Sequence, residues 1–116
     1  MADNLTKYFR THHLPWSEAV EDDDIVAPSP FTSEDVVVVT LKMDGEIFWG
    51  YPSGYTHARS IDSVNHESRD YVKSYWRERA YNLPEGWRVC GENMFAKHSI
   101  FYNNLKSYLY VFSIWD

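Results

Sequence analysis

The distribution of apolar residues along the chain predicts a buried strand followed by a hairpin. Asp35–Leu41 contains an uninterrupted run of valines, which is typical of a strand buried on both faces. Glu46–Tyr51 and Tyr55–Ser60 carry strand-like aromatic residues, and Pro52-Ser53-Gly54 between them has the composition of a tight turn. We therefore expect a buried strand that leads directly into Lys42, and a β-hairpin after it.

The next segment has the spacing of an amphipathic helix. Between Ser68 and Tyr81, apolar residues recur every three or four positions, which places them on one face of a helix. Leu83–Gly86 supplies the residues that end it, and Trp87–Glu92 and Tyr108–Trp115 have the aromatic and β-branched content of strands. The polar residues expected to face away from the apolar stripe are Arg69, Asp70, Lys73, Arg77 and Glu78.

Strands at hairpin spacing with one substantial helix favour an α+β fold with an antiparallel-rich sheet. Residues 1–116 then form one domain, in which residues 1–34 are an irregular arm because proline and mixed charge interrupt any periodicity there. The last strand, Tyr108–Trp115, is apolar enough for the centre of a sheet, yet the sequence stops one residue later. Because an apolar edge strand invites pairing, we expect a truncated domain, or one that a second chain completes.

Composition narrows the class of protein further. With 44% apolar and 17% aromatic residues, the chain has ample material for a hydrophobic core. Its net charge of -6 lacks the basic excess of proteins that bind nucleic acid through phosphates alone, so any RNA contact is expected to be local. The single cysteine, and the absence of a signal-like leader or a long apolar run, predict a cytoplasmic protein without membrane contact.

Lys42 opens the segment Lys42-Met43-Asp44-Gly45-Glu46. A lysine that emerges from a buried strand is held in place and partly desolvated. Desolvation disfavours the ammonium form and lowers the lysine pKa, as a nucleophilic amine requires. Gly45 permits a tight turn after the lysine. Taken alone, the same five residues also fit an exposed lysine in an ordinary hairpin turn.

The residues around this lysine resemble a known family. Lys42-Met43-Asp44-Gly45 resembles motif I of the covalent nucleotidyltransferases, the Lys-X-Asp-Gly of ATP-dependent RNA and DNA ligases and of capping enzymes. Three further stretches resemble motifs of one RNA ligase branch. His57–Ser63 resembles its motif Ia, Val89–Glu92 its motif III, and Tyr108–Phe112 its motif IIIa. Two further stretches similar to that branch are Ala96–Ile100 and Arg10–Trp16. The resemblance implies the N-terminal part of an ATP-dependent RNA ligase, with an incomplete nucleotidyltransferase domain of the ATP-grasp-like ligase type.

The resemblance also implies a role for each matching residue. Lys42 would attack the α-phosphate of ATP to form lysyl-AMP, with Mg²⁺ offsetting the developing charge. The Asp44-Gly45 turn would belong to the nucleotide site, and Arg59 would contact the ribose or the phosphate of the nucleic-acid end. Glu92 would reach the ribose or a metal-bound water, and Phe112 would stack on adenine. A surface ion pair for Arg59 and core packing for Phe112 stay open as alternatives.

Three further residues are candidate contacts to phosphate or RNA. His57 and His98 lie in the stretches that resemble the ligase branch, and Lys97 precedes the second histidine. A histidine in such a position is more often a hydrogen-bonded structural group than a ligand-binding one, so both interpretations are kept.

The sequence departs from the family pattern beside the nucleotide site. Leu41 stands where the branch usually has glutamate, Ile47 where asparagine is common, and Ser113 where many members have aspartate. Motif IV, with an acidic metal ligand, and motif V, with lysines for the triphosphate, have no counterpart before Asp116. We therefore expect an RNA ligase-like nucleotidyltransferase that joins RNA ends by lysine adenylylation, with the missing motifs supplied in trans and the isolated chain inactive or very slow. The alternative is a degenerate, noncatalytic module that binds nucleotide, RNA or protein.

Overall fold

The computed structural model describes residues 3, 5–8, 11–18, 20–27, 31–61, 66–96 and 100–116. Short strands, one α-helix and two 3₁₀ turns make up its regular structure. Among these residues, none of the helices has the length and apolarity that crossing a membrane requires. The elements are β1 (Glu46–Gly50), β2 (Thr56–His57), η1 (Glu67–Arg69), α1 (Asp70–Arg77), η2 (Ala80–Asn82), β3 (Arg88–Asn93) and β4 (Leu109–Trp115).

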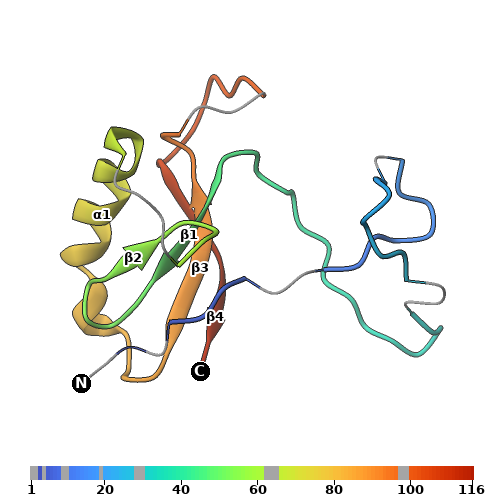
Figure 1. The fold of residues 1–116 in the computed structure, drawn as a ribbon, viewed down its shortest axis with the longest axis horizontal. Helices are drawn as coiled ribbons and strands as arrows, with labels where there is room; N and C mark the ends of the chain where they lie inside the picture. Colours follow the sequence, from blue (N-terminus) through green and yellow to red (C-terminus); the bar gives the residue numbers. More distant parts are fainter. Residues whose placement is uncertain are drawn as a thin grey trace. The chain divides into compact units, whose positions relative to one another are not determined.

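The four strands form one antiparallel sheet in the order β2-β1-β3-β4, and α1 lies on one side of it (Figure 1). The β1–β2 hairpin closes through a Tyr51 N–H to Tyr55 carbonyl bond of 3.1 Å, and Gly54 in its turn has a φ of +94°, which favours glycine. This arrangement confirms the predicted α+β class, the hairpin after Lys42 and the single α-helix, which is shorter than the predicted Ser68–Tyr81.

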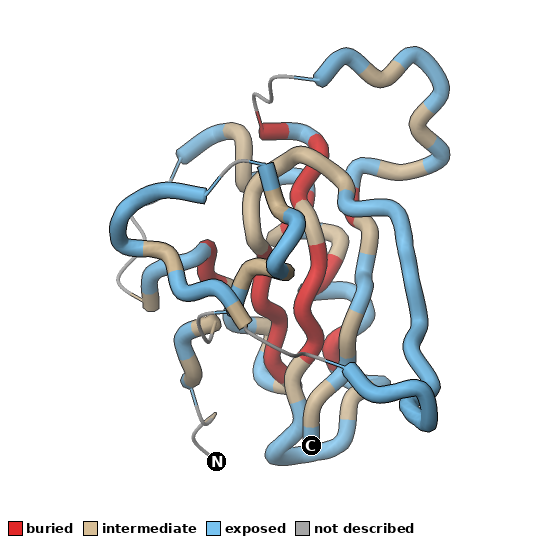
Figure 2. The backbone as a smooth tube through the Cα atoms, turned by 90° about the vertical axis from the view of Figure 1, so that its right-hand side faces the viewer, coloured by how far each residue is buried: buried red, intermediate tan, exposed pale blue. Residues whose placement is uncertain are grey.

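The hydrophobic core lies between the sheet and α1. Phe48 from β1, Val89 from β3 and Leu109 from β4 meet Val72 and Trp76 of the helix, and all five are buried. The Trp76 indole N–H donates to the backbone carbonyl of the residue that follows β1, at 2.8 Å. Buried residues concentrate along the two central strands (Figure 2). The apolar spacing of the helix and the alternation of the strands therefore meet in one shared core.

The opposite face of the sheet carries polar and aromatic side chains. Since successive strand residues point to opposite faces, Arg88, Cys90 and Glu92 of β3 point away from the face that Val89 presents to the core. The Arg88 guanidinium lies 5.2 Å from the Trp49 ring centroid and 5.4 Å from that of Trp115. Cation–π contacts of this kind hold β1, β3 and β4 together on the face that carries Glu92.

The prediction of a buried strand at Asp35–Leu41 is wrong. Residues 35–41 have no regular secondary structure and are exposed, Val36 to 96% and Leu41 to 82%. β-Branched residues favour an extended backbone, but a strand also needs a neighbouring backbone with which to pair. In the observed sheet β1 already has β2 on one side and β3 on the other, so no position beside β1 is open to this segment.

The last strand lies at the edge of the sheet, although its apolar character favoured the centre. In the described part of the chain β4 pairs with β3 alone. Val111, Phe112 and Ile114 are 48%, 52% and 60% exposed. The strand itself was predicted within one residue, and it is the apolar edge strand that the sequence analysis expected. Completion of the sheet by a second chain stays a prediction.

Residue contacts divide the chain into two compact units, Met1–Lys7 with Lys42–Asp116, and Tyr8–Leu41. The sheet and α1 belong to the first unit. The second unit is organised around His13, whose backbone N–H donates to the Ile25 carbonyl at 2.7 Å and whose ring Nε2 lies 3.2 Å from the Asp24 carboxylate. The assignment of residues 1–116 to one nucleotidyltransferase domain, with an arm over residues 1–34, stays a prediction.

Candidate active site

The turn that contains Lys42 is tied to a distant segment through Asp44. The Asp44 backbone N–H donates to the Tyr102 hydroxyl at 2.9 Å, and the Asp44 carboxylate accepts from the Ile100 backbone N–H at 3.1 Å. These two bonds join residues that are more than fifty positions apart. In this structure, Asp44 therefore fixes the position of its own turn relative to the segment that precedes β4.

Glu92 closes the turn from the other side. Its Oε1 accepts a hydrogen bond from the Gly45 backbone N–H at 3.1 Å. Burial raises the pKa of the Glu92 carboxyl, the Gly45 bond and the attraction of Lys42 oppose that rise, and the neighbouring Asp44 and Glu46 add to it. Glu92 therefore lies within electrostatic reach of Lys42. The Gly45–Glu92 hydrogen bond joins the two stretches that resemble motif I and motif III.

Lys42 itself lies in a different setting from the one predicted. It is exposed and follows an irregular segment, so the expectation that it emerges partly desolvated from a buried strand is wrong. The physical reason is the missing strand partner, described above for residues 35–41. Lys42 is nevertheless near enough to Glu92 for its charge to oppose the rise in the pKa of that carboxyl. The assignment of Lys42 as the nucleophile stays a prediction.

Gly45 is required for close packing, whereas the sequence predicted that it permits a tight turn. A Cβ built on Gly45 would lie 2.5 Å from the Asn93 carbonyl oxygen and 2.9 Å from the Met94 Sδ. Both distances are shorter than side-chain carbons tolerate, and the Asn93 atom belongs to a paired strand that cannot move independently. The close approach of the turn to the end of β3, rather than a positive φ, therefore requires glycine here.

Phe112 occupies an irregularity in the sheet. The β3–β4 register shifts between Cys90 and Gly91, which pair with Ser113 and Val111, and Phe112 is the extra residue between these two pairs. A β-bulge of this kind re-aims side chains and is frequent beside functional sites. Phe112 is 52% exposed, so its ring has accessible surface, as adenine stacking requires.

Arg59 lies two residues beyond the end of β2 and is exposed. Ile47, which replaces a common asparagine, pairs with Glu92 across the β1–β3 ladder. Of the residues predicted from the resemblance, the structure joins Gly45 to Glu92 through a hydrogen bond, and Asp44 lies in the same turn as Gly45. The roles of Lys42, Arg59 and Phe112 stay predictions.

His57 is buried, at 5% exposure, within the first unit. Its Nε2 is 2.7 Å from the Tyr51 hydroxyl, and its Nδ1 is 2.6 Å from the Ala58 carbonyl oxygen, to which only a protonated nitrogen can donate. Burial lowers the pKa of His57, although hydrogen bonds to the backbone of Ala58 and Ser60 oppose this change. Both ring nitrogens are thus engaged inside the protein, and the proposed RNA contact stays a prediction.

The lowered pKa of His57 predicts a loss of stability in mild acid. The unfolded chain takes up a proton near the ordinary histidine pKa of 6.5, whereas the folded chain resists protonation. The contribution of neutral His57 to the free energy of unfolding is therefore complete above that pH. It is lost as the pH falls from there through the folded-state pKa. Thermal unfolding between pH 7.5 and pH 5, as an approximate window from, should show this loss in the natural chain. His57→Gln should lack it, and an equal pH dependence in both would contradict the assignment.

Lys97 and His98, the other two predicted RNA contacts, lie outside the described residues. Their assignment stays a prediction that the structure leaves untested.

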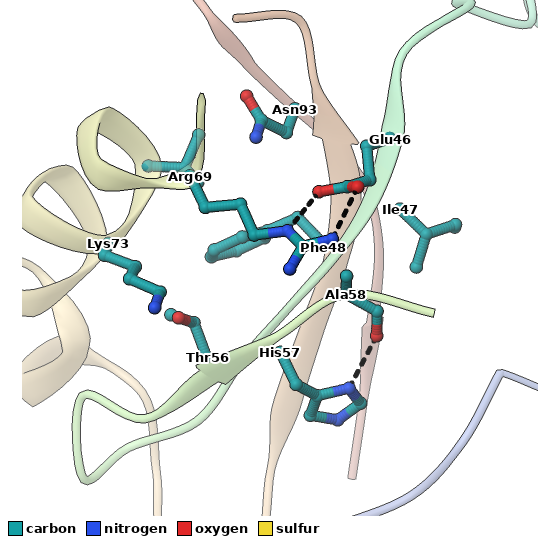
Figure 3. A pocket seen from close by; sticks show the side chains of 10 residues that line it. Glu46, Ile47, Phe48, Thr56, His57, Ala58, Arg69, Lys73 and Asn93 are labelled. Carbon is teal, nitrogen blue, oxygen red and sulfur yellow. Dashed lines mark hydrogen bonds and ion pairs between the residues drawn. The ribbon is translucent and has the colours of Figure 1, made fainter. Parts of the chain in front are cut away.

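A small cavity lies on the helix side of the sheet, between α1 and the β1–β2 hairpin (Figure 3). Arg69 donates two hydrogen bonds to the Glu46 carboxylate there, at 2.7 and 2.8 Å, and Asn93 donates to the Ser68 carbonyl oxygen at 3.1 Å. The placement of Arg69 on the outward polar side of the helix is therefore wrong. With a volume of about 20 Å³, the cavity has room for about one water molecule, so it is no nucleotide site.

Two carboxylates near the Lys42 turn already accept hydrogen bonds from the chain itself. Among the described residues, no group of three or more His, Cys, Asp or Glu side chains is placed to hold a metal ion. Glu92 has one oxygen engaged by Gly45, and the Asp44 carboxylate accepts from Ile100. Glu92 as a metal ligand therefore stays a prediction.

Comparison with known proteins identifies the family to which the chain belongs. A sequence model of the RNA ligase family matches residues 35–116, well over half of the chain, including the Lys42 turn and the whole sheet. The chain belongs to the RNA ligase family, which confirms the resemblance found in the sequence. No curated protein and no solved structure gave a significant match.

Several contacts of the candidate site were not predicted from the sequence. Tyr102 and the backbone of Ile100 hold the Lys42 turn, but neither residue shows a periodic or charged pattern that would single it out. The only available signal was the resemblance of Ala96–Ile100 to the ligase branch.

Proposed function

We propose that the chain acts as an RNA ligase-like nucleotidyltransferase that takes AMP from ATP onto Lys42 and passes it to an RNA end. The observation that supports this proposal best is the convergence of Lys42, Gly45 and Glu92. Two motif-like stretches that are remote in sequence meet through the Gly45–Glu92 hydrogen bond and the attraction between Glu92 and Lys42. Membership of the RNA ligase family supports the same proposal.

In the proposed first step, the uncharged Lys42 amine attacks the α-phosphorus of ATP. A nitrogen–phosphorus bond forms, the bond from that phosphorus to the bridging oxygen of pyrophosphate breaks, and pyrophosphate leaves. The amine proton passes to solvent, which reaches this exposed side chain. The product is lysyl-AMP, a phosphoramidate that stores the energy of the broken bond for the next step.

In the second and third steps, AMP would pass from Lys42 to the 5′-phosphate of an RNA end, and a 3′-hydroxyl would then displace AMP to seal the strand. Glu92 is proposed to accept hydrogen bonds from the ribose with the carboxylate oxygen that Gly45 leaves available. Phe112 is proposed to stack on adenine, and Arg59 to hold the ribose or the terminal phosphate as a bidentate donor.

Magnesium is the metal that the family resemblance implies, and it would offset charge on the phosphates when bound. The described residues do not form its site on their own. The proposal therefore assigns to this chain only what its own residues do: Lys42 supplies the amine, and Asp44, Gly45 and Glu92 hold its turn in place.

Intact-mass measurement of the full chain after incubation with ATP, with and without Mg²⁺, tests the proposal. We expect a gain of one adenylate that is labile in acid, as a phosphoramidate is, and that disappears in Lys42→Ala. Lys7→Ala is the matched control, because Lys7 is also an exposed lysine and should keep the adduct. An adduct that persists in Lys42→Ala would place the chemistry on another residue.

A noncatalytic binding module is the second candidate, and the exposure of Lys42 favours it, since a nucleophilic lysine is usually desolvated in a pocket. The apolar Leu41 and Ile47 beside the turn also reduce the polar contacts available to a nucleotide. A natural chain whose mass does not change with ATP, although calorimetry shows that it binds the nucleotide, supports this alternative and contradicts adenylylation.

A further inference from the structure

A cluster of aromatic rings connects α1 to the segment between β3 and β4. Tyr71 of α1 is stacked on Tyr75, with ring centroids 6.0 Å apart and an interplanar angle of 24°, and on Phe95, at 6.1 Å and 7°. Tyr108 forms T-shaped contacts with Tyr71 at 5.2 Å and with Phe95 at 5.1 Å. Tyr71, Phe95 and Tyr108 are 38%, 50% and 43% exposed, so part of this aromatic surface faces solvent.

A pocket opens beside this cluster, formed by the segment that leads into β4. Its volume is about 380 Å³, within the range of sites that hold small ligands and far above that of the cavity beside Glu46. Three phenols, an amide, a hydroxyl and one ammonium group line it. The lining residues are Tyr71, Tyr102, Asn103, Leu105, Lys106, Ser107 and Tyr108.

The chain holds the pocket wall in place with its own hydrogen bonds. The Lys106 backbone N–H donates to the Tyr110 hydroxyl at 3.1 Å, and the Leu109 backbone N–H donates to the Ser107 hydroxyl at 3.2 Å. The Tyr108 carbonyl accepts from the Met94 backbone N–H at 2.7 Å. These bonds use backbone groups, so the side chains of Lys106 and Tyr108 stay available for a ligand.

We propose that this pocket, the tyrosine pocket, binds one unpaired nucleotide of a single-stranded RNA segment. An exposed phenol ring accepts a nucleobase of any identity by stacking. The Asn103 amide can both donate to and accept from a base edge, and the Lys106 ammonium suits a phosphate. Of the described residues that line the pocket, Lys106 alone carries a charge, so the lining favours an anionic strand although the whole chain has a net charge of -6.

The aromatic rings in the lining favour an unpaired strand over a duplex. In an A-form duplex the base faces are stacked inside the helix, so rings such as Tyr71 and Tyr108 reach only bases that are splayed out. A polypeptide partner would use the apolar ring surface but would leave Lys106 and Asn103 without a specific role. RNA as the ligand class rests on the proposed function, which this inference deepens.

The tyrosine pocket shares a wall with the candidate active site. Tyr102 lines the pocket and its hydroxyl accepts the Asp44 backbone N–H at 2.9 Å. A strand seated in the pocket therefore lies next to the residue that holds the Lys42 turn. This position suits an RNA segment near the end to be joined, and it assigns Tyr71, Asn103 and Lys106 to substrate binding rather than to chemistry.

Fluorescence anisotropy of the full chain with a labelled, unstructured RNA strand of about ten nucleotides tests the proposal. We expect Tyr71→Leu to raise the Kd about tenfold, because a stacking ring is lost. Lys106→Ala should weaken binding and lower the slope of log Kd against log salt by about one. Tyr81→Leu is the matched control: Tyr81 is 81% exposed on η2 and outside the pocket, so it should bind as the natural chain does.

The measurement omits ATP, so it does not depend on adenylylation, and the mass assay above omits RNA, so either proposal can fail alone. Circular dichroism first establishes that each variant is folded. Competition by duplex RNA as strong as by single strands would overturn the proposal, as would equal Kd values for Tyr71→Leu, Lys106→Ala and the natural chain. If the folded natural chain binds no RNA, the proposal is also overturned and a polypeptide becomes the better occupant.

Discussion

Gly45→Ala is expected to destabilise the folded chain by about 3 kcal/mol and to lower its melting temperature by about 10 °C. The new Cβ would lie 2.5 Å from the Asn93 carbonyl oxygen and 3.1 Å from the Asn93 carbonyl carbon. Because Asn93 is paired with both Glu46 and Leu109, neither side can give way without breaking ladder hydrogen bonds. The turn must instead lift away from β3, and the Gly45–Glu92 bond is lost with it.

Gly86→Ala is the matched control for this change. Gly86 has a φ of +83° and no atom within 4 Å of a Cβ built on it, so alanine there costs only backbone strain of about 1 kcal/mol. Thermal and urea unfolding of both variants gives the comparison. A Gly45→Ala chain no less stable than Gly86→Ala would show that the turn does not approach β3 as closely as described.

Substitutions at Glu92 have the second large expected effect, on catalysis. Under the proposed function, Glu92→Ala should reduce the rate of adduct formation on Lys42 at least about a hundredfold, as loss of a positioned polar group in a catalytic site commonly does. It should also cost about 1–2 kcal/mol of stability, because the Gly45 N–H loses its partner. Rates are measured by intact mass against time, and stability by urea unfolding.

Glu92→Gln separates these two effects. The amide oxygen can still accept from Gly45, so the turn stays bound, while the negative charge is removed. Burial raises the pKa of Glu92 above its ordinary value of 4.5. The contribution of this carboxyl to stability is therefore complete below that pH and is lost as pH rises through the folded-state pKa. At neutral pH, Glu92→Gln should be at least as stable as the natural chain, and their difference should shrink toward pH 4.5.

An unstable Glu92→Gln chain at neutral pH would contradict this assignment, since it would mean that the ionised carboxylate stabilises the fold. A Glu92→Gln chain that forms the adduct at the natural rate would remove Glu92 from the nucleotide site while leaving its structural bond intact.

The parts of the fold that could be predicted are those with local periodicity. The helix, the hairpin and the β3 and β4 strands all show spacing or alternation within a few residues, and each was found within a few residues of its predicted bounds. The valine run at residues 36–39 shows the limit of this reasoning. Its residues favour an extended backbone, but a strand also needs a free neighbouring strand, and this depends on the whole sheet. Both edges of β1 are already paired, with β2 and β3.

The residues of the candidate site could likewise be predicted only where a local pattern marked them. Short motifs pointed to Lys42, Gly45 and Glu92, because each motif is contiguous and resembles a family pattern. The contacts that Asp44 makes to Tyr102 and Ile100 join segments with no shared local pattern, so they could be found only in three dimensions. The exposure of Lys42 also depended on the missing strand, and one wrong element thus changed the environment expected for the central residue.

The two bonds at Asp44 have a thermodynamic consequence for the order of binding. Because the Lys42 turn and the segment before β4 are tied at two points, a ligand that restricts one of them also restricts the other. The first ligand to bind then bears the loss of conformational entropy for both segments. RNA and nucleotide would therefore each bind more tightly after the other has bound, and by linkage the gain in affinity would be the same for both.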